Sequence, residues 1–206
     1  MQLQLLQDID FNQFQFKCNQ ITHAVTNIQL NMIGSMDRKD LVYIHCIEYP
    51  WNGTQRNDTV IFEIPPCLAE KIRELESRVF NHMKSLQYYD DPSVNFSSRI
   101  SVQDGVYLLK CKLTENMGVG SVYKSEKWTH THGVISPIGN DKKVVLKSEF
   151  AEQVKRGVPC WVVLKLGSKI WQIEPNGKFG VSFTVDRIII FDDNINKCGK
   201  HAFSFH

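Results

Sequence analysis

Tryptophan and lysine residues stand close together within residues 157–192, and their chemistry suits a single-stranded nucleic acid. Trp161 lies four residues before Lys165, and Lys169 lies two residues before Trp171. Aromatic rings can stack on bases, and ammonium groups can neutralise the phosphates that link them. The same residue types also serve as half-buried packing residues and as solvated lysines on an open sheet face, so both interpretations stay open for these two pairs.

Cations elsewhere in the chain could extend this candidate surface. Lys110 and Lys112 alternate with apolar residues, so on a strand they would project from the face opposite to the apolar one. In this interpretation Trp161 and Trp171 stack bases, while these two lysines and the two in the first stretch hold the backbone. The remaining candidate contacts to nucleic acid are Arg99, Lys124, Lys127, Trp128, Lys178 and Arg187.

The spacings of common catalytic and nucleotide-binding motifs are absent from the sequence. It contains no phosphate-binding loop, dinucleotide-binding glycine fingerprint, nucleophile elbow or zinc-protease helix motif. Two histidines, His130 and His132, are separated by one residue, and a Cys-x-x-His pair is formed by Cys198 and His201. Four such ligands could hold zinc if they converged, but their spacing does not indicate that they do. We therefore expect no enzymatic activity, no metal and no cofactor.

Composition limits the class of protein. The chain has 206 residues, 42% of them hydrophobic, and a formal net charge of +2. This length suffices for one sizeable core, but a groove for nucleic acid would require local segregation of charge. The N-terminus lacks the pattern of a secretory signal, and no stretch is apolar enough to span a membrane. Six scattered cysteines without a close pair favour reduced thiols. We therefore expect an intracellular protein.

Hydrophobic patterns predict the elements that would position the candidate residues. β-Branched and apolar runs predict strands at residues 21–31, 41–47 and 59–64. A long helix is predicted from Pro66 to about residue 87, because apolar residues recur there at helical spacing after two prolines. Ser148 can cap a second, short helix of sequence SEFAEQVKR.

Turn residues predict the hairpins. Asp104-Gly105 predicts a tight turn ahead of the strand that carries Lys110 and Lys112. Residues 157–192 read as three successive strands, joined by two-residue turns at Gly167-Ser168 and Asn176-Gly177. Residues 114–143 are rich in turn-forming residues and predict a loop with one or two short strands. Core positions in the last strand would be its phenylalanines, Phe179, Phe183 and Phe191.

The order of these elements predicts the fold class. Strands, one long helix, further strands, a short helix and a last run of strands favour an α+β, mainly β domain around an antiparallel β-barrel that is closed or half closed. We divide the chain into a Gln-rich N-terminal segment at residues 1–20, a single barrel domain at residues 21–192 and a C-terminal tail at residues 193–206.

Two segments carry a resemblance to a known family. The strand DGVYLLKCKL, from Asp104 to Leu113, and the closing strand GKFGVSFTVDRIIIFD, from Gly177 to Asp192, resemble segments of the single-stranded-DNA-binding proteins of large nucleo-cytoplasmic DNA viruses. This resemblance implies an OB-like antiparallel β-barrel that binds single strands with little sequence preference and coats replicating viral DNA cooperatively. It also implies a homo-oligomer or cooperative filament. The chain ends in NKCGKHAFSFH, where members of that family often carry an acidic tail.

Taken together, these features predict a DNA-binding protein, with single-stranded DNA as the partner and RNA as a possible one, and without a membrane partner. It would act in the host cytoplasm or nucleus, at replication sites, if the chain is viral. The alternative is a β-rich structural or assembly subunit, whose strands would lie in two packed sheets. A second alternative is an enzyme whose site is assembled from distant residues such as His130 and His132.

Overall fold

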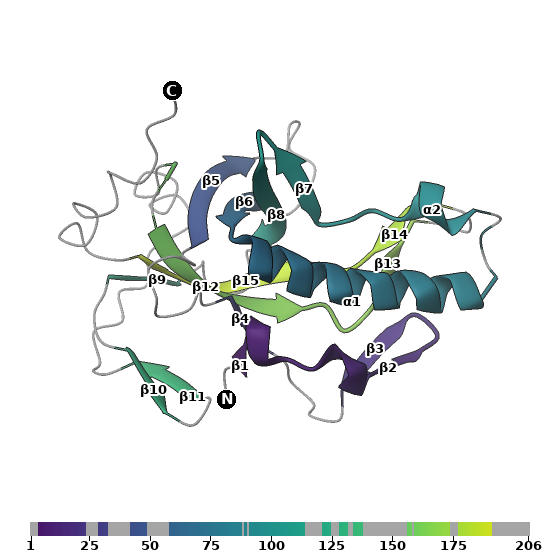
Figure 1. Cartoon of the computed structure of the whole chain (residues 1–206), viewed down its shortest axis with the longest axis horizontal. Helices are drawn as coiled ribbons and strands as arrows, with labels where there is room; N and C mark the ends of the chain where they lie inside the picture. The colour runs from purple at the N-terminus through teal and green to yellow at the C-terminus, as the bar shows by residue number, and fades with distance from the viewer. Residues whose placement is uncertain are drawn as a thin grey trace.

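The computed structural model describes residues 4–23, 29–32, 42–48, 58–87, 89, 91–113, 121–124, 128–131, 134–137, 156–157, 159–173 and 177–190. Strands predominate in these ranges and two α-helices accompany them, so the predicted α+β, mainly β class is confirmed. Figure 1 shows the long helix α1 running beside the strands along the longest dimension of the molecule.

Nine strands belong to one sheet. Their bounds are β1 Gln4–Leu5, β4 Gln29–Met32, β5 Val42–Glu48, β6 Asp58–Ile64, β7 Ile100–Gln103, β8 Val106–Leu113, β9 Ser121–Lys124, β12 Pro159–Leu166 and β15 Phe183–Ile190. Three separate two-stranded pairs are β2 Phe14–Lys17 with β3 Gln20–His23, β10 Trp128–Thr131 with β11 Val134–Pro137, and β13 Trp171–Gln172 with β14 Phe179–Gly180.

Five strands of the large sheet are joined in a circuit of pairings. β5, β6 and β8 pair antiparallel in sequence order, β8 pairs with β15, β15 pairs with β12, and β12 returns to β5. Two joints of this circuit are short: β8 meets β15 through Thr184 and Lys112, and β12 meets β5 through two residue pairs that begin at Pro159. The described strands therefore form no continuously hydrogen-bonded closed barrel.

The expected all-antiparallel arrangement is wrong at strand β15. β15 runs parallel to β8 and also parallel to β9. A parallel neighbour requires a long connection between the two strands, because a tight hairpin can only reverse the chain. The long stretch of sequence between β8 and β15 supplies that connection, whereas the prediction was based on hairpin signals.

Helix α1, Pro66–Ser85, confirms the predicted long helix. Pro66 is its first residue, where a missing backbone N–H has no cost, and an apolar stripe packs into the core. The stripe consists of Leu68, Ala69, Ile72, Leu75, Val79 and Met83, which are fully buried. α2, Pro92–Asn95, is a short helix that the sequence did not predict. No helix among the described residues combines the length and the apolar content of a membrane span.

The predicted hairpin turn at Asp104-Gly105 is confirmed. Both residues have positive φ, at 49° and 77°, which is the backbone geometry of a two-residue hairpin loop matched to strand twist. β7 and β8 pair on either side of it, from Gln103 with Val106 to Ile100 with Leu109.

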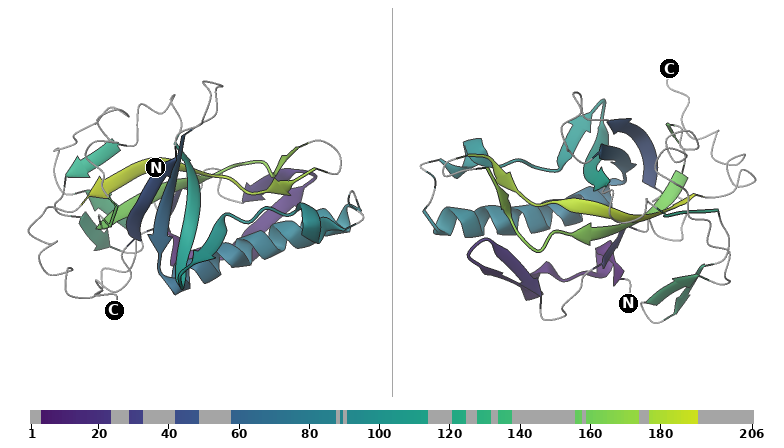
Figure 2. Two further views of the ribbon diagram at one scale, coloured as in Figure 1. Left: turned by 90° about the horizontal axis from the view of Figure 1, so that it is seen from above. Right: turned by 180° about the vertical axis from the view of Figure 1, so that it is seen from behind.

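The second predicted turn, Gly167-Ser168, is wrong. β12 pairs along its length with β15 instead of with β13, and the Gly167 N–H donates to the Ser182 carbonyl at 2.8 Å. A two-residue turn with glycine first needs a positive φ at that glycine, and Gly167 does not have one. The chain therefore leaves β12, forms the β13–β14 hairpin and returns into β15. The two views of Figure 2 show this hairpin beside the C-terminal half of α1, together with β2–β3.

The Gln-rich N-terminal residues contribute to the core, which the sequence analysis did not predict. Leu6, Ile9, Phe11 and Phe14 are buried in the same cluster as the strands and α1. The domain boundary proposed at residue 20 stays a prediction, although these side chains pack into the core formed by residues after it. The short helix predicted from Ser148 and the tail at residues 193–206 lie outside the described residues.

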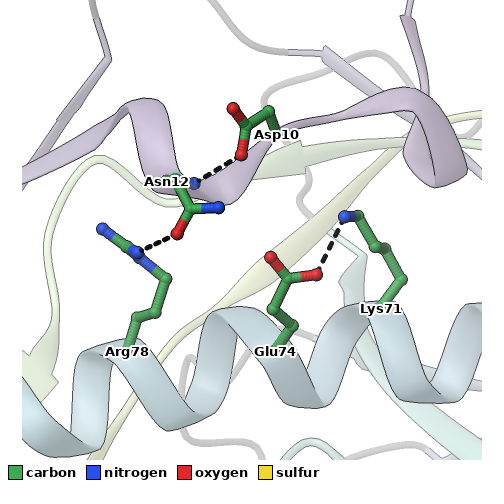
Figure 3. Close-up of polar contacts among 5 residues, drawn as sticks. All are labelled: Asp10, Asn12, Lys71, Glu74 and Arg78. Atoms are coloured by element: carbon green, nitrogen blue, oxygen red, sulfur yellow. Dashed lines mark hydrogen bonds and ion pairs between the residues drawn. The ribbon is translucent and has the colours of Figure 1, made fainter.

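Polar contacts also hold this segment against α1 (Figure 3). Asp10 accepts a hydrogen bond from the Asn12 backbone N–H at 2.9 Å and so caps the 3-10 turn Phe11–Gln13. Arg78 of α1 donates to the Asn12 side-chain oxygen at 2.7 Å. The N-terminal segment is therefore fastened by both apolar and polar contacts.

Candidate nucleic-acid interface

Two of the predicted lysines lie in one row across the large sheet. Lys165 of β12 pairs with Thr184 of β15, Thr184 pairs with Lys112 of β8, and Lys112 pairs with Thr59 of β6. Directly paired residues project from the same face of a sheet. All four side chains are half buried, whereas the next residue along each strand is buried on the opposite face; these neighbours are Leu164, Val185, Cys111 and Val60. We call this set, Lys165, Thr184, Lys112 and Thr59, the polar row.

The charge of Lys112 is poorly accommodated in the free protein. Partial burial and the nearby charge of Arg99 lower the pKa of the Lys112 ammonium below its usual value. An anion beside Lys112 would offset both effects, because an opposite charge favours the ammonium form. Lys110, two residues earlier on β8, is exposed on the same face.

The β13–β14 hairpin presents three further exposed side chains. Lys169 and Ile173 are exposed, and between them Ile170 is buried while Trp171 is half buried, so this alternation places Lys169, Trp171 and Ile173 on one side of the chain. Lys178 is exposed opposite Ile173, whose N–H donates to the Lys178 carbonyl at 2.9 Å. The hairpin therefore combines two cations with an apolar side chain that is 59% exposed.

Trp171 is fixed in position by contacts with the Val181 carbonyl, with Arg99 and with Gly180. Its Nε1–H donates to the Val181 carbonyl at 2.8 Å, and the guanidinium of Arg99 lies 5.2 Å from the ring centroid. Arg99 Nε donates to the same Val181 carbonyl at 2.9 Å. A Cβ atom at Gly180 would stand 3.0 Å from the Trp171 ring and 2.6 Å from the Ser97 carbonyl, so glycine is required there. Trp171 and Arg99 form a rigid, half-buried unit instead of two independent surface groups.

The carboxylate of Glu76 ties this unit to helix α1. Glu76 is 3% exposed and accepts hydrogen bonds from the Arg99 backbone N–H and the Ser98 hydroxyl, both at 2.6 Å. Burial raises the pKa of the Glu76 carboxyl, while these bonds and the charges of Arg99 and Arg73 oppose the rise.

Glu63 lies further along β6 on the face of the polar row and is paired with a histidine of β5. His45, the extra residue of a β-bulge in β5, has its Nδ1 2.7 Å from Glu63 Oε1. Arg156 lies 3.9 Å from the same oxygen. Glu63 is two register positions beyond Ile61, which pairs with Lys110, so the cationic part of this face gives way to a carboxylate there.

For several of the predicted contact residues the structure gives the strand register of the backbone. Trp161 pairs with Ile189, while Arg187 pairs with Val163 and Ser121, next to the register irregularity in β12 and β15. Two more predicted residues lie on the strands β9 and β10; they are Lys124, paired with Ile190, and Trp128, paired with Pro137. Lys127 lies outside the described residues.

The candidate zinc ligands are not tested by the structure. His130 lies on β10, and the other candidates, His132, Cys198 and His201, lie outside the described residues. Within the part of the chain that is described, no three metal-ligating side chains gather.

Three residues of the interface were missed by the sequence analysis: Thr184, Gly180 and Glu76. Thr184 and Gly180 gave no local signal, because their roles depend on which strands and side chains pack beside them. Glu76 did give one: it lies four residues after Ile72 and seven before Met83, within the apolar stripe of α1. A charged residue at such a position indicates a buried partner.

Comparisons with known proteins give limited similarity. No family model and no curated protein matches the chain. Among solved structures, it is similar to the single-stranded DNA-binding protein from bacteriophage Enc34, C-terminal truncation, with 12% identity and a TM-score of 0.45 over 87% of this chain and 92% of that chain. It is also similar to the bacteriophage Enc34 protein in complex with ssDNA, with 11% identity and a TM-score of 0.42 over 85% of this chain and 92% of that chain. At these scores the likeness carries no argument about function, and the resemblance to proteins of large nucleo-cytoplasmic DNA viruses has no counterpart among these matches.

Proposed function

We propose that the protein binds single-stranded DNA along the polar row and the β13–β14 hairpin. The observation that carries the proposal is the register of Lys165, Thr184 and Lys112 on one sheet face, where Lys165 and Thr184 stand on the two strands that the hairpin joins. Single-strand binders combine a cationic track for phosphates with surfaces for bases. Here the lysines of the row would hold phosphates, and the hairpin would contact bases.

The circuit of five strands supports an OB-like barrel as the scaffold. β5, β6, β8, β12 and β15 would be its five strands in chain order, and the short joints described above would leave the barrel partly open. In OB folds the second and third strands and the loop between the fourth and fifth bind oligonucleotides. Those elements correspond to β6, β8 and the β13–β14 hairpin, which carry the polar row and the exposed lysines.

Each predicted residue has a proposed role. Lys112, Lys165, Lys169 and Lys178 neutralise phosphates, with Lys110 beside them. A base stacks on the part of the Trp171 ring that Arg99 leaves open, and Trp161 stacks a second base. The proposed outer contacts of the track are Lys124, Lys127, Trp128 and Arg187.

The biological setting of this binding follows from the family resemblance. The protein would coat single-stranded DNA without sequence preference during viral replication, inside the infected cell, and would self-associate along the strand. It would have no enzymatic activity. A structural subunit with two packed sheets is less favoured, because nine of the described strands belong to one sheet.

Titration with oligo-dT tests the proposal. Tryptophan fluorescence should be quenched on binding. The logarithm of the affinity should fall linearly with the logarithm of the salt concentration, because phosphate contacts release counterions. A protein variant with Lys112→Ala and Lys165→Ala together should bind more weakly, whereas Lys84→Ala, which removes an exposed lysine from α1, is the matched control. Absence of oligo-dT binding by the unmodified protein at about 50 mM salt would refute the proposal, because non-specific binding is strongest at low salt.

A further inference from the structure

The carboxylate of Glu76 has no role in phosphate or base contacts, yet it is buried at the base of the interface. A buried carboxylate is expensive unless hydrogen bonds satisfy it. Its two bonds, from the Arg99 N–H and the Ser98 hydroxyl, go to the segment that enters β7 rather than to its own helix. The carboxylate therefore joins α1 to the residue whose side chain covers Trp171.

The contacts form a chain from the helix to the hairpin. Glu76 holds the backbone of Arg99, and the Arg99 side chain lies over Trp171 and shares the Val181 carbonyl with it. Val181 follows directly after β14, so this carbonyl lies on the short segment that leads from the hairpin into β15. The Ser97 N–H also donates to the Phe179 carbonyl of β14 at 2.8 Å. The segment 97–99 thus connects α1 with both strands of the hairpin.

We propose that Glu76 is a positioning residue for single-stranded DNA: through residues 98 and 99 it sets the orientation of Trp171, and with it the β13–β14 hairpin, relative to the polar row. This inference rests on the proposed function. Its physical basis is that a site holds a ligand well when its supporting hydrogen bonds restrict the residues that make contact. The charge of the carboxylate is less important than the two hydrogen bonds that join position 76 to Arg99 and Ser98.

The test compares Glu76→Ala with Glu76→Gln at pH 7. The alanine variant loses both acceptors and should bind oligo-dT about tenfold more weakly, within the usual range for coupled neighbours. The glutamine variant keeps an oxygen for the Arg99 N–H and an amide for the Ser98 hydroxyl, and should bind within about twofold of the unmodified protein. Equal losses in the two variants would overturn the inference.

A second comparison separates positioning from stability. Val79→Ala removes buried apolar volume from the same helix without touching residues 98 and 99, and should leave the affinity unchanged under conditions where the protein is folded. In a double-mutant cycle with Trp171→Phe, the effect of Glu76→Ala should shrink, because both changes disturb one unit. Additive effects, or a Val79→Ala variant as weak as Glu76→Ala, would contradict a positioning role.

A spectroscopic measurement keeps the inference testable without DNA. In a variant whose other three tryptophans, Trp51, Trp128 and Trp161, are changed to Phe, Trp171 is the only emitter. Glu76→Ala should shift its emission to longer wavelength and raise its quenching by acrylamide, while Glu76→Gln should not. Unchanged emission in Glu76→Ala would refute positioning, and failure of the unmodified protein to bind oligo-dT would refute the proposed function separately.

Discussion

Lys112 and Lys165 lie on one face of the sheet, on either side of Thr184, although they belong to strands that do not pair with each other. Thr184 pairs with Lys165 in the antiparallel direction and with Lys112 in the parallel direction. The two lysines therefore flank the same residue, and the phosphate backbone of a DNA strand that crosses β15 would contact both. This relationship gives the proposed track its direction, across the strands rather than along them.

The salt dependence of DNA binding should show whether these two lysines contact phosphates. For single-stranded DNA the logarithmic slope of affinity against salt changes by about 0.7 for each phosphate contact. Lys112→Ala and Lys165→Ala should each reduce the slope by about that amount, and the double variant by about twice as much. Titrations with oligo-dT at several salt concentrations measure the slope. Lys84→Ala should leave it unchanged, and a Lys112→Ala slope equal to that of the unmodified protein would remove Lys112 from the track.

The lowered pKa of Lys112 predicts a pH effect on binding. The free protein should lose the Lys112 proton at lower pH than an ordinary lysine, because burial and Arg99 disfavour its charge. Affinity for oligo-dT should therefore fall as the pH rises toward the lysine range, and binding at high pH should be accompanied by proton uptake. Lys112→Arg keeps the charge and should retain affinity to higher pH. Parallel pH profiles for the arginine variant and the unmodified protein would contradict this assignment.

Glu76 predicts a pH dependence of stability. Its pKa in the folded protein is raised above the usual glutamate value of 4.5, so the folded state binds more protons than the unfolded state just above that pH. The contribution of Glu76 to the free energy of unfolding should thus fall as the pH rises through the window from about 4.5 to its folded pKa. Glu76→Gln should remove this contribution. Urea unfolding between pH 4 and pH 8, roughly the range in which native proteins are most stable, provides the measurement. A glutamine variant with the same pH slope as the unmodified protein would show that Glu76 is not responsible.

Gly180→Ala should disturb the hairpin directly. The added Cβ would meet the Ser97 carbonyl at 2.6 Å and the Trp171 ring at 3.0 Å, both of which belong to rigid groups. We expect a loss of about 1–3 kcal/mol in the free energy of unfolding, as for other overpacked sites. The Trp171 emission should change at the same time. Ser101→Ala, at an exposed position on β7, is the control and should change neither property.

Ile173 should contribute to binding without affecting its salt dependence. Its exposed side chain stands between the exposed lysines Lys169 and Lys178 on the hairpin, where it can contact a base by burial of apolar surface. Ile173→Ser should weaken oligo-dT binding about tenfold, as expected from the loss of two or three buried carbons, and keep the salt slope.

Val102→Ser is the matched control for Ile173→Ser, because Val102 is similarly exposed, at 55%, but lies on β7. Sedimentation of both variants without DNA checks self-association. If Ile173→Ser altered self-association and left the affinity unchanged, Ile173 would belong to a contact between protein copies.

Local patterns in the sequence were sufficient for several elements. The apolar spacing of α1 and the Asp104-Gly105 turn were predicted correctly, because each depends on contacts within one turn of helix or across one hairpin. The alternation along β8 also predicted that Lys110 and Lys112 lie opposite the buried Leu109 and Cys111.

Local signals failed where distant segments competed for the same strand. Gly167-Ser168 has turn chemistry, yet β12 pairs with β15, which buries Leu164 against Val185 and continues the ladder up to Leu166, directly before the expected turn. The turn propensity of two residues has less influence on the structure than the pairing of two long strands. The N-terminal segment was likewise read as Gln-rich, although its apolar residues, such as Phe11 and Phe14, reach the core.

The sequence by itself determined which residues could bind nucleic acid: the alternating lysines, the tryptophans and the strand faces on which they stand. Only the tertiary structure decided which of them meet. Thr184 joins Lys112 to Lys165, and Glu76 holds Arg99 over Trp171. These relationships connect segments far apart in the chain, and their geometry depends on strand register and on a buried charge. Neither is encoded in a local pattern, because both are set by the packing of the whole core.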